Sequence, residues 1–300
     1  MKINCKQFIE KYYSNQSSTT ISKARSSIRN IKSLVEDVEQ LQQKDIELYS
    51  KIFSLKSTGN QVSRGKYYET KALLVNLEDF LGEKFCIPKR EELLDYSIPS
   101  RYFYSLDELL KKIDTAATYN PSLKAPYERL LFLKGIVVLG WYGLSLQQIT
   151  ELKKESVNLD SMCVVVEDSS VRLQPEHFEI IRKIKLLRQY KISKDVIINQ
   201  LKIKWMFSCT DDKISTSALT QRLSYFNKNI PDNMSFSINF ELLYRNNVFV
   251  ELLNYEIENK TTLAREEVIT FFTKKLQINT RRSAINRYAD YTLWKSNYSK

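Results

Sequence analysis

The chain has 300 residues, of which 43% are hydrophobic and 12% aromatic, enough to form sizeable cores and to exclude a disordered protein. The formal net charge of +11 at pH 7 favours a polyanionic partner. Four scattered cysteines and one histidine predict neither a disulfide framework nor a metal site, and no cofactor is expected. Without a signal peptide or an apolar run of roughly 18–20 residues, no membrane association is expected and the location should be cytoplasmic.

The basic residues concentrate in particular segments. Residues 1–98 carry sixteen Lys and Arg against thirteen Asp and Glu, whereas the remainder carries thirty against twenty-two. Residues 182–204 hold eight basic residues and one acid, and the last thirty residues hold seven and one. Such segments indicate a nucleic-acid-binding face rather than a uniformly solvated surface.

Residues 1–98 predict a small all-helical domain of about four helices. Helices are expected over 1–13, in one or two pieces over 21–49, and over 66–81, where Gly82 closes the helix. Four basic residues lie largely off the apolar stripe of the second helical region, and they are either phosphate contacts or ordinary solvated charges: Lys23, Arg25, Arg29 and Lys32. Two prolines in residues 86–100 indicate a domain linker there.

Residues 99–300 predict a second, mostly helical domain with a small β-hairpin or sheet. Ser105 and Ser145 each precede a Glu or Gln by three residues, which is the capping-box pattern at a helix start. Between these two starts, the helix over 127–141 is apolar over most of its surface and should be central. After them the pattern predicts a helix at 146–153, strands at 162–166 and 171–173, a helix from Pro175 to about residue 190, a strand-like run at 205–208, and helices at 215–227, 237–256, 263–275 and 279–298.

The order of elements after residue 104 resembles the catalytic domain of tyrosine recombinases, the phage-integrase family. The resemblance is carried by GLSLQQITELK at 143–153, VNLD at 157–160, VRLQP at 171–175 and the helical region at 213–228, which resembles the family's DNA-facing helix. It implies a two-domain architecture, with residues 1–98 as a helical core-binding (SAM-like) DNA-binding domain and residues 99–300 as a catalytic-like domain.

The family's chemistry requires a tyrosine nucleophile, two arginines that clamp the phosphate, and a lysine and histidines that move protons. The position of the first arginine is Ser145, which cannot neutralise a phosphate. The turn at 167–170 contains no lysine, and the second arginine's box keeps Arg245 but lacks its histidine. Tyr288, or Tyr291, would be the nucleophile. The resemblance therefore implies a degenerate site at Ser145, Arg245 and Tyr288, and no enzymatic activity.

DNA binding would survive the loss of this chemistry, because phosphate contacts need only basic side chains and helix N-termini. The helix over 215–227 carries polar and basic groups on one side, so it is either a reader of the major groove or an ordinary amphipathic helix. The residues expected to contact DNA are Lys23, Arg25, Arg29, Lys32, Lys153, Lys154, Arg172, Lys213, Thr216, Ser217, Gln221, Arg222, Lys228, Arg245, Arg281, Arg282 and Arg287.

Three functions remain open from the sequence. The first is a sequence-specific double-stranded DNA-binding protein with an inactive recombinase fold, located at the nucleoid of a bacterial cell. Its role would be that of a transcriptional repressor in the lysogeny of a temperate bacteriophage or in another mobile element. The second is a divergent active integrase, in which Lys153, Lys154 or Arg172 replaces the lost groups. The third is a helical interaction protein without a DNA role. A homodimer or a regulatory protein partner is compatible with the first.

Overall fold

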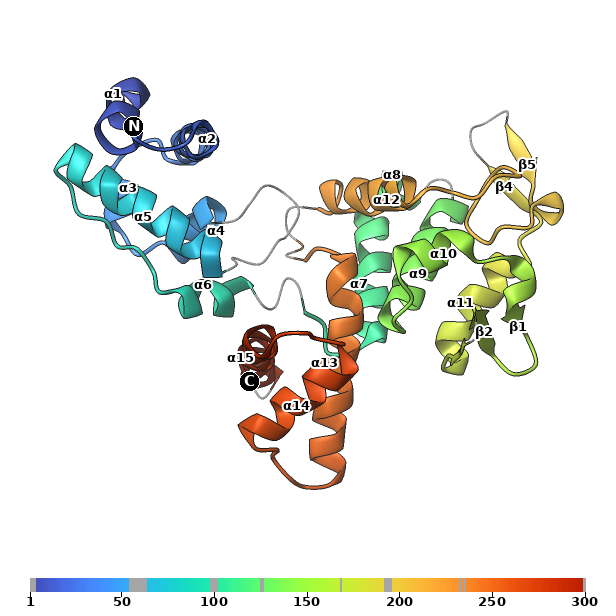
Figure 1. The fold of residues 1–300 in the computed structure, drawn as a ribbon. Coiled ribbons are helices and arrows are strands. Elements are labelled where there is room, and N and C mark those ends of the chain that lie inside the picture. The colour runs from blue at the N-terminus through green and yellow to red at the C-terminus, as the bar shows by residue number, and fades with distance from the viewer. Residues whose placement is uncertain are drawn as a thin grey trace. The chain divides into compact units, whose positions relative to one another are not determined.

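The computed structural model describes residues 4–53, 64–97, 102–124, 127–167, 169–191, 196–231, 234 and 236–298. The chain divides into two compact units, Met1–Pro99 and Ser100–Lys300 (Figure 1). The described residues are mostly helical with small antiparallel sheets, which confirms the predicted fold class. Asp168 of the turn expected at 167–170, and part of the basic segment 182–204, lie outside the described residues.

The first unit contains six helices among its described residues, two more than expected. They are α1 (Cys5–Tyr13), α2 (Ser18–Leu34), α3 (Glu39–Gln42), α4 (Ile46–Phe53), α5 (Arg64–Leu81) and α6 (Arg90–Ser97). The prediction of one or two helices over 21–49 was wrong because Val35 leaves helical geometry and Gln43 is again extended. Asp45 then accepts a hydrogen bond from the Leu48 backbone N–H (2.9 Å), which starts α4.

The linker expected over 86–100 is wrong for residues 86–97, which belong to the first unit. The backbone N–H of Cys86 donates to the Leu41 carbonyl (2.9 Å), and the Tyr67 hydroxyl donates to the Pro88 carbonyl (2.9 Å). Leu93 on α6 is fully buried. Pro88 therefore lies inside the domain, because the core of the first unit continues to Leu93, while residues 98–100 lie outside the described residues.

The second unit is built around α9 (Tyr127–Trp141), as its apolar sequence predicts. This helix packs against α7 (Leu106–Tyr119), α8 (Pro121–Lys124), α10 (Leu146–Glu151), α11 (Pro175–Lys185) and α13 (Phe240–Glu258). Gly135 permits the close approach of α11, because a Cβ there would lie 2.3 Å from Ile184 Cδ1. Gly140 does the same for α13, where a Cβ would lie 2.6 Å from Phe240 Cε2.

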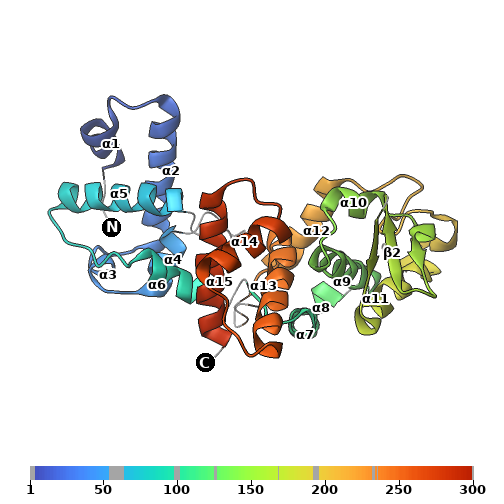
Figure 2. The ribbon, with the colours of Figure 1, turned by 60° about the horizontal axis from the view of Figure 1, so that its bottom comes forward.

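Three more helices belong to the second unit. They are α12 (Thr216–Lys228), which precedes α13 in the chain, and α14 (Arg265–Lys275) and α15 (Arg281–Tyr298), which follow it. α15 packs on α14 and on α13, so that these three helices lie side by side (Figures 1 and 2). Trp294 of α15 is fully buried in this packing.

A three-stranded antiparallel sheet has the order β1 (Val157–Asn158), β2 (Cys163–Val166), β3 (Ser169–Arg172). Val164 of β2 pairs with Val157 and Val171. Since the chain has no glycine after Gly143, the turns flanking β2 place Met162 and Glu167 at positive φ.

Two predicted boundaries in this region were wrong. The helix from Pro175 ends at Lys185 rather than near residue 190, because β4 (Gln189–Lys191) pairs with β5 (Ile197–Asn199) in a second antiparallel sheet. The strand-like run at 205–208 forms a single bridge, in which Trp205 pairs with Lys153. Its apolar side chains Met206 and Phe207 are instead core residues.

Candidate nucleic-acid interface

The α12 helix presents a polar face to solvent. Ser215 caps its first turn by accepting a hydrogen bond from the Ala218 N–H (3.1 Å), and Leu219, Leu223 and Phe226 bury its inner side. Four of the expected DNA contacts lie exposed on the other side: Thr216, Ser217, Gln221 and Lys228. A helix of 13 residues is about 20 Å long at 1.5 Å per residue, a length and width that fit the major groove.

Arg222, although expected on this face, points inward. Its Nη1 donates to the Phe207 carbonyl (3.2 Å), and its guanidinium carbon lies 5.5 Å from the centroid of the Phe132 ring. The reason is helical position, since residue 222 directly borders the buried positions 219, 223 and 226. Arg222 therefore packs α12 onto the core, and its contact with DNA stays a prediction.

Lys153 and Lys154, which follow α10, and Lys213, which precedes α12, differ in the partners that they contact. Lys153 pairs with Glu155 (3.4 Å) and the exposed Lys213 with Glu151 (3.0 Å), and both ion pairs are solvent-exposed and weak. Lys154, in contrast, donates to the Gln200 carbonyl, and burial lowers the pKa of its ammonium. Lys154 therefore holds the segment that follows β5, and its contact with DNA stays a prediction.

In the first unit, α2 exposes three basic side chains on one flank. Arg25, Arg29 and Lys32 are exposed and follow a spacing of four and three residues, which places them above one another on a helix. Lys23 is also exposed but lies on the other flank, where it lines a cavity of about 400 Å³ between α2, α1 and α5. The structure thus separates Lys23 from the other three.

The three arginines of α15 that were expected to contact DNA also differ in their surroundings. Arg281 and Arg282 are exposed, and Arg281 pairs with Glu266 at 2.9 Å. Arg287 pairs with Asp290 at 2.8 Å, and the Asp290 side chain is only 6% exposed. A buried carboxylate requires its charged partner, so Arg287 has a structural role, and its contact with DNA stays a prediction.

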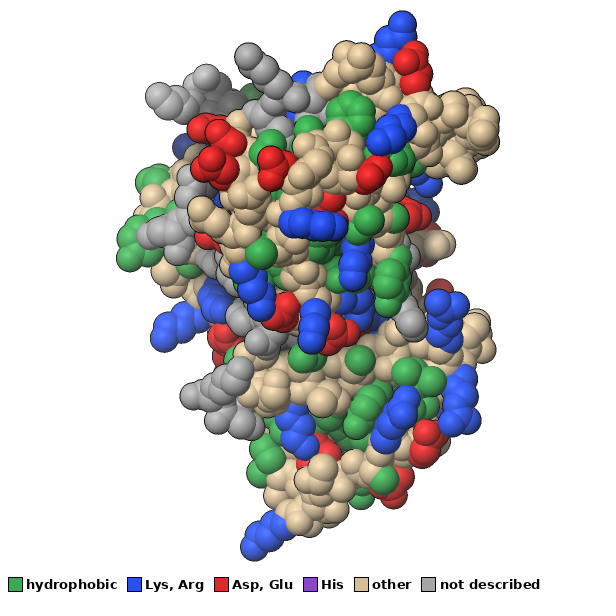
Figure 3. Space-filling view, turned by 90° about the vertical axis from the view of Figure 1, so that its left-hand side faces the viewer, with side chains coloured by type: hydrophobic (Ala, Val, Ile, Leu, Met, Phe, Trp, Pro, Cys, Tyr) green, Lys and Arg blue, Asp and Glu red, His purple; other side chains and the backbone are tan. Residues whose placement is uncertain are grey.

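Basic and acidic side chains alternate on the face of the molecule drawn in Figure 3. That face carries no field of a single sign, so the net charge of +11 alone does not define an interface. The interface must be assigned element by element.

Ser145 and Arg245, two of the three degenerate catalytic positions, have structural partners. The Ser145 hydroxyl accepts from the Gln148 N–H (3.2 Å), and the Gln148 side chain accepts from the Ser145 N–H (2.9 Å), which completes the predicted capping box. Arg245 is half-buried on α13, and its Nη1 donates to the hydroxyl of buried Tyr102 at 3.4 Å. Burial, with Asp290 nearby, raises the pKa of Tyr102 to about 12, although Arg245 opposes that rise.

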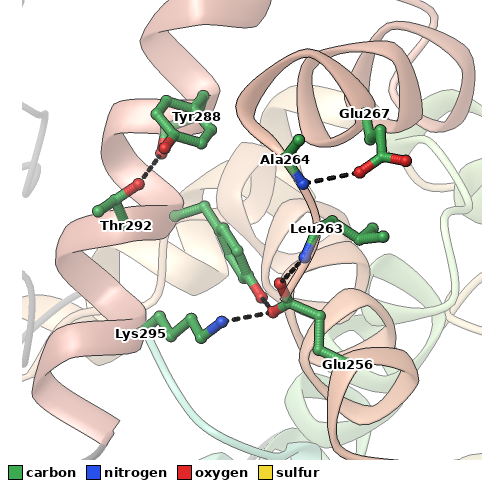
Figure 4. A network of polar contacts seen from close by, with 8 residues as sticks. Glu256, Leu263, Ala264, Glu267, Tyr288, Thr292 and Lys295 are labelled. Atoms are coloured by element: carbon green, nitrogen blue, oxygen red, sulfur yellow. Dashed lines mark hydrogen bonds and ion pairs between the residues drawn. The ribbon is translucent and has the colours of Figure 1, made fainter. Parts of the chain in front are cut away.

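The two candidate nucleophiles lie on α15 in different surroundings (Figure 4). Tyr288 is half-buried, and its ring centroid lies 5.7 Å from the guanidinium carbon of Arg265. Tyr291 is 3% exposed and donates its hydroxyl to Glu256. Burial and this hydrogen bond raise the pKa of Tyr291 well above its ordinary range, so the structure does not offer Tyr291 as a nucleophile.

Glu256 of α13 is the centre of a buried polar network that the sequence did not reveal. It accepts from the Lys295 ammonium (2.7 Å), the Leu263 N–H (3.0 Å) and the Tyr291 hydroxyl (Figure 4). Burial alone would raise the pKa of Glu256, but these hydrogen bonds outweigh it and lower the pKa. The network ties α15 to the end of α13 and the turn that follows.

A second unpredicted arrangement surrounds the single histidine. His177 is buried, its Nδ1 lies 2.9 Å from the Tyr142 hydroxyl, and its Nε2 lies 3.2 Å from Asp107 Oδ1. The Gln174 N–H donates to the same tyrosine hydroxyl (3.1 Å). These residues line a cavity of about 670 Å³ that the exposed Arg172 also borders. Sequence spacing could not predict this arrangement, because Asp107, Tyr142 and His177 are far apart in the chain.

Within the described residues, no group of three His, Cys, Asp or Glu side chains is placed to hold a metal ion. The same described ranges contain no helix long and apolar enough to cross a membrane.

No family model and no curated protein matches the chain. Solved structures of tyrosine recombinases do resemble it over nearly its whole length. The crystal structure of XerA recombinase covers 98% of this chain and 97% of its own, with 16% identity and a TM-score of 0.40. A lambda integrase fragment, crystallised as a dimer bound to a COC′ core site, covers 95% of each chain with 14% identity and a TM-score of 0.37. A lambda integrase tetramer bound to a Holliday junction covers 95% of this chain and 76% of its own, at 13% identity and a TM-score of 0.37.

Proposed function

We propose that the chain is a sequence-specific double-stranded DNA-binding protein with a recombinase-like fold that lacks DNA-cleaving chemistry. Its use would be transcriptional regulation, as a repressor in a temperate phage or another mobile element. The observation that carries the proposal is the exposed polar face of α12, with Ser217, Gln221 and Lys228 directed to solvent above an apolar inner side.

The character of this face favours DNA over a protein partner. Apart from Tyr225, which is 44% exposed between Gln221 and Lys228, its exposed side chains are polar, whereas the centre of an interface with a protein is more apolar. Gln221 can pair with an adenine edge through two hydrogen bonds, and Lys228 and the N-terminus of α12 can contact phosphates. The exposed flank of α2, with Arg25 and Arg29, supplies further phosphate contacts from the first unit.

The environment of the degenerate positions favours binding without cleavage. Ser145 caps α10 and carries no charge, which leaves Arg245, hydrogen-bonded to Tyr102, as the one guanidinium at these positions. A single arginine would compensate less of the charge of the phosphoryl-transfer transition state than the two that the chemistry requires. Tyr288 would then lack the pair of arginines that a phenol needs beside it to attack a phosphate.

The proposal is tested by fluorescence anisotropy with duplex fragments from the protein's own genomic region. Gln221→Ala should weaken specific binding by roughly five- to a hundredfold while leaving non-specific binding unchanged, because a bidentate base contact contributes about 1–3 kcal/mol. Lys228→Ala should weaken both kinds of binding and reduce the salt slope by about one. Lys111→Ala, an exposed lysine on α7, is the matched control and should change neither. Equal affinity for every fragment would refute sequence-specific binding.

Cleavage is tested separately with a nicked suicide duplex, which traps a covalent protein–DNA adduct. No adduct is expected from the wild-type chain or from Tyr288→Phe. An adduct in the wild type that disappears in Tyr288→Phe would show a divergent active recombinase instead. A promoter-reporter assay then decides the regulatory role, since a repressor lowers transcription from the bound fragment and Gln221→Ala relieves it.

A further inference from the structure

A groove of about 560 Å³ lies behind the exposed face of α12, between that helix, α8, α9 and β4. Its volume is within the ordinary range of small-molecule sites, roughly 300–1,000 Å³. Leu130 and Leu133 of α9 and Phe226 of α12 line it with apolar surface. Gln221 and Lys228 of the proposed DNA contact also line the groove, whereas Arg129, Leu130 and Leu133 take no part in that contact.

Three cationic side chains line the same groove. Arg129 lines the groove together with Tyr190, which is 4% exposed, and Arg222 donates to the Phe207 carbonyl at 3.2 Å. Lys228 lies at the end of α12. Among the described residues that line the groove there is no Asp or Glu, so no acidic side chain of this lining neutralises its positive charges.

Arg222 is held in place before any ligand arrives. Its guanidinium lies over the Phe132 ring, and its Nη1 donates to the Phe207 carbonyl. Burial raises the pKa of Tyr190, so this phenol remains a neutral hydrogen-bonding group that can donate at neutral pH. Two guanidiniums and a phenol are groups that bind a planar or tetrahedral oxyanion by charge-assisted hydrogen bonds.

From this combination we infer that the groove is a binding site for a small organic anion with an apolar body. The carboxylate, sulfonate or phosphate head binds between Arg129 and Arg222, and the apolar body packs on Leu130, Leu133 and Phe226. A DNA backbone fits less well, because it has no apolar part to cover these side chains and because Arg222 is set back against Phe132.

The test uses the full chain and two fluorescent probes of similar shape. Anilinonaphthalene sulfonate carries the anionic head, and phenylnaphthylamine is its neutral counterpart. The wild type should bind one molecule of the sulfonate per chain. Arg129→Met should weaken the sulfonate about tenfold or more, which corresponds to about 1.4 kcal/mol, while changing the neutral probe less than about twofold. Arg129→Lys keeps the charge and should recover part of the affinity, and Arg25→Met in the first unit is the matched control.

A second variant makes the result independent of the arginine's structural role. Ala218 of α12 lines the groove and is half-buried, so Ala218→Trp fills the space and should abolish binding of both probes. Far-ultraviolet circular dichroism confirms that each variant is folded. The inference is overturned if Arg129→Met leaves sulfonate affinity unchanged, or if Ala218→Trp retains wild-type binding of the probes. It is also overturned if duplex DNA displaces the sulfonate and Arg129→Met weakens DNA as much as Lys228→Ala, since the groove is then a phosphate-backbone site.

Discussion

Replacing Lys295 by Met removes one donor from the buried carboxylate of Glu256 and preserves most of the apolar length of the side chain. The Lys295 ammonium lies 2.7 Å from Glu256 Oε2, with side chains 30% and 4% exposed. The tyrosine hydroxyl and the Leu263 N–H remain as partners of the carboxylate. The substitution therefore tests how strongly this network holds α15, the helix that carries Tyr288.

The expected cost is about 2 kcal/mol, because a hydrogen bond to a charged group contributes roughly 1.5–3 kcal/mol net. For a unit of about 200 residues, this corresponds to a decrease in Tm of about 4–8 °C. Tyr291→Phe should cost a similar amount, since it removes the hydroxyl but keeps the ring against Phe249 and Trp294, at centroid distances of 5.4 and 5.9 Å.

Urea unfolding followed by tryptophan fluorescence measures the effect in the right part of the chain. All three tryptophans, Trp141, Trp205 and Trp294, belong to the second unit. The network lowers the pKa of Glu256 from its ordinary 4.5, so its stabilisation is present above that pH and is lost as the pH falls through the lowered value. The difference between wild type and Lys295→Met should therefore be complete at pH 7 and shrink below about pH 4.5.

Lys274→Met, an exposed lysine on α14, is the control and should cost less than about 0.5 kcal/mol. If Lys295→Met and Tyr291→Phe both cost as little as this control, the network does not hold α15. A difference that persists unchanged to pH 3 would contradict its ionic origin.

Three further outcomes follow from the packing and charge of the second unit. Ser145→Ala should lower stability by about 1 kcal/mol through loss of the cap of α10, and an unchanged urea midpoint would contradict that role. Gly135→Ala should cost about 1–3 kcal/mol, because the new Cβ meets the Ile184 side chain, and thermal unfolding would measure it. Lys154→Met should leave the salt slope of DNA binding unchanged, whereas Lys228→Ala reduces it, and equal slopes would show that Lys154 does reach the phosphates.

Local patterns predicted the elements whose formation depends on near neighbours. The capping box at Ser145 is present as predicted, because it needs only a partner three residues away. Ser105 also caps its helix, but the Glu108 carboxylate accepts from the Tyr104 N–H (2.8 Å) instead of completing the box with the Ser105 N–H. The central position of α9 followed from its apolar surface, and the polar side of α12 from helical periodicity. The short β-hairpin was also predicted, because its two strands are near neighbours in the sequence.

Patterns failed where a distant segment decides the outcome. Residues 189–191 are a strand only because residues 197–199 pair with them, and α6 belongs to the first core because Leu93 is buried there. Helical spacing placed Arg222 near the polar face of α12, yet the Phe207 carbonyl and the Phe132 ring draw it inward.

The sequence by itself determined a basic, mostly helical chain with a capping box at Ser145. Only the tertiary structure decided which cations are free for a partner and which are held inside. Arg287 and Lys154 are held by Asp290 and the Gln200 carbonyl, whereas Lys228 and Arg25 remain exposed. The physical reason is that a long basic side chain can reach solvent or a buried acceptor, and only the folded neighbours determine which of the two lies within its reach.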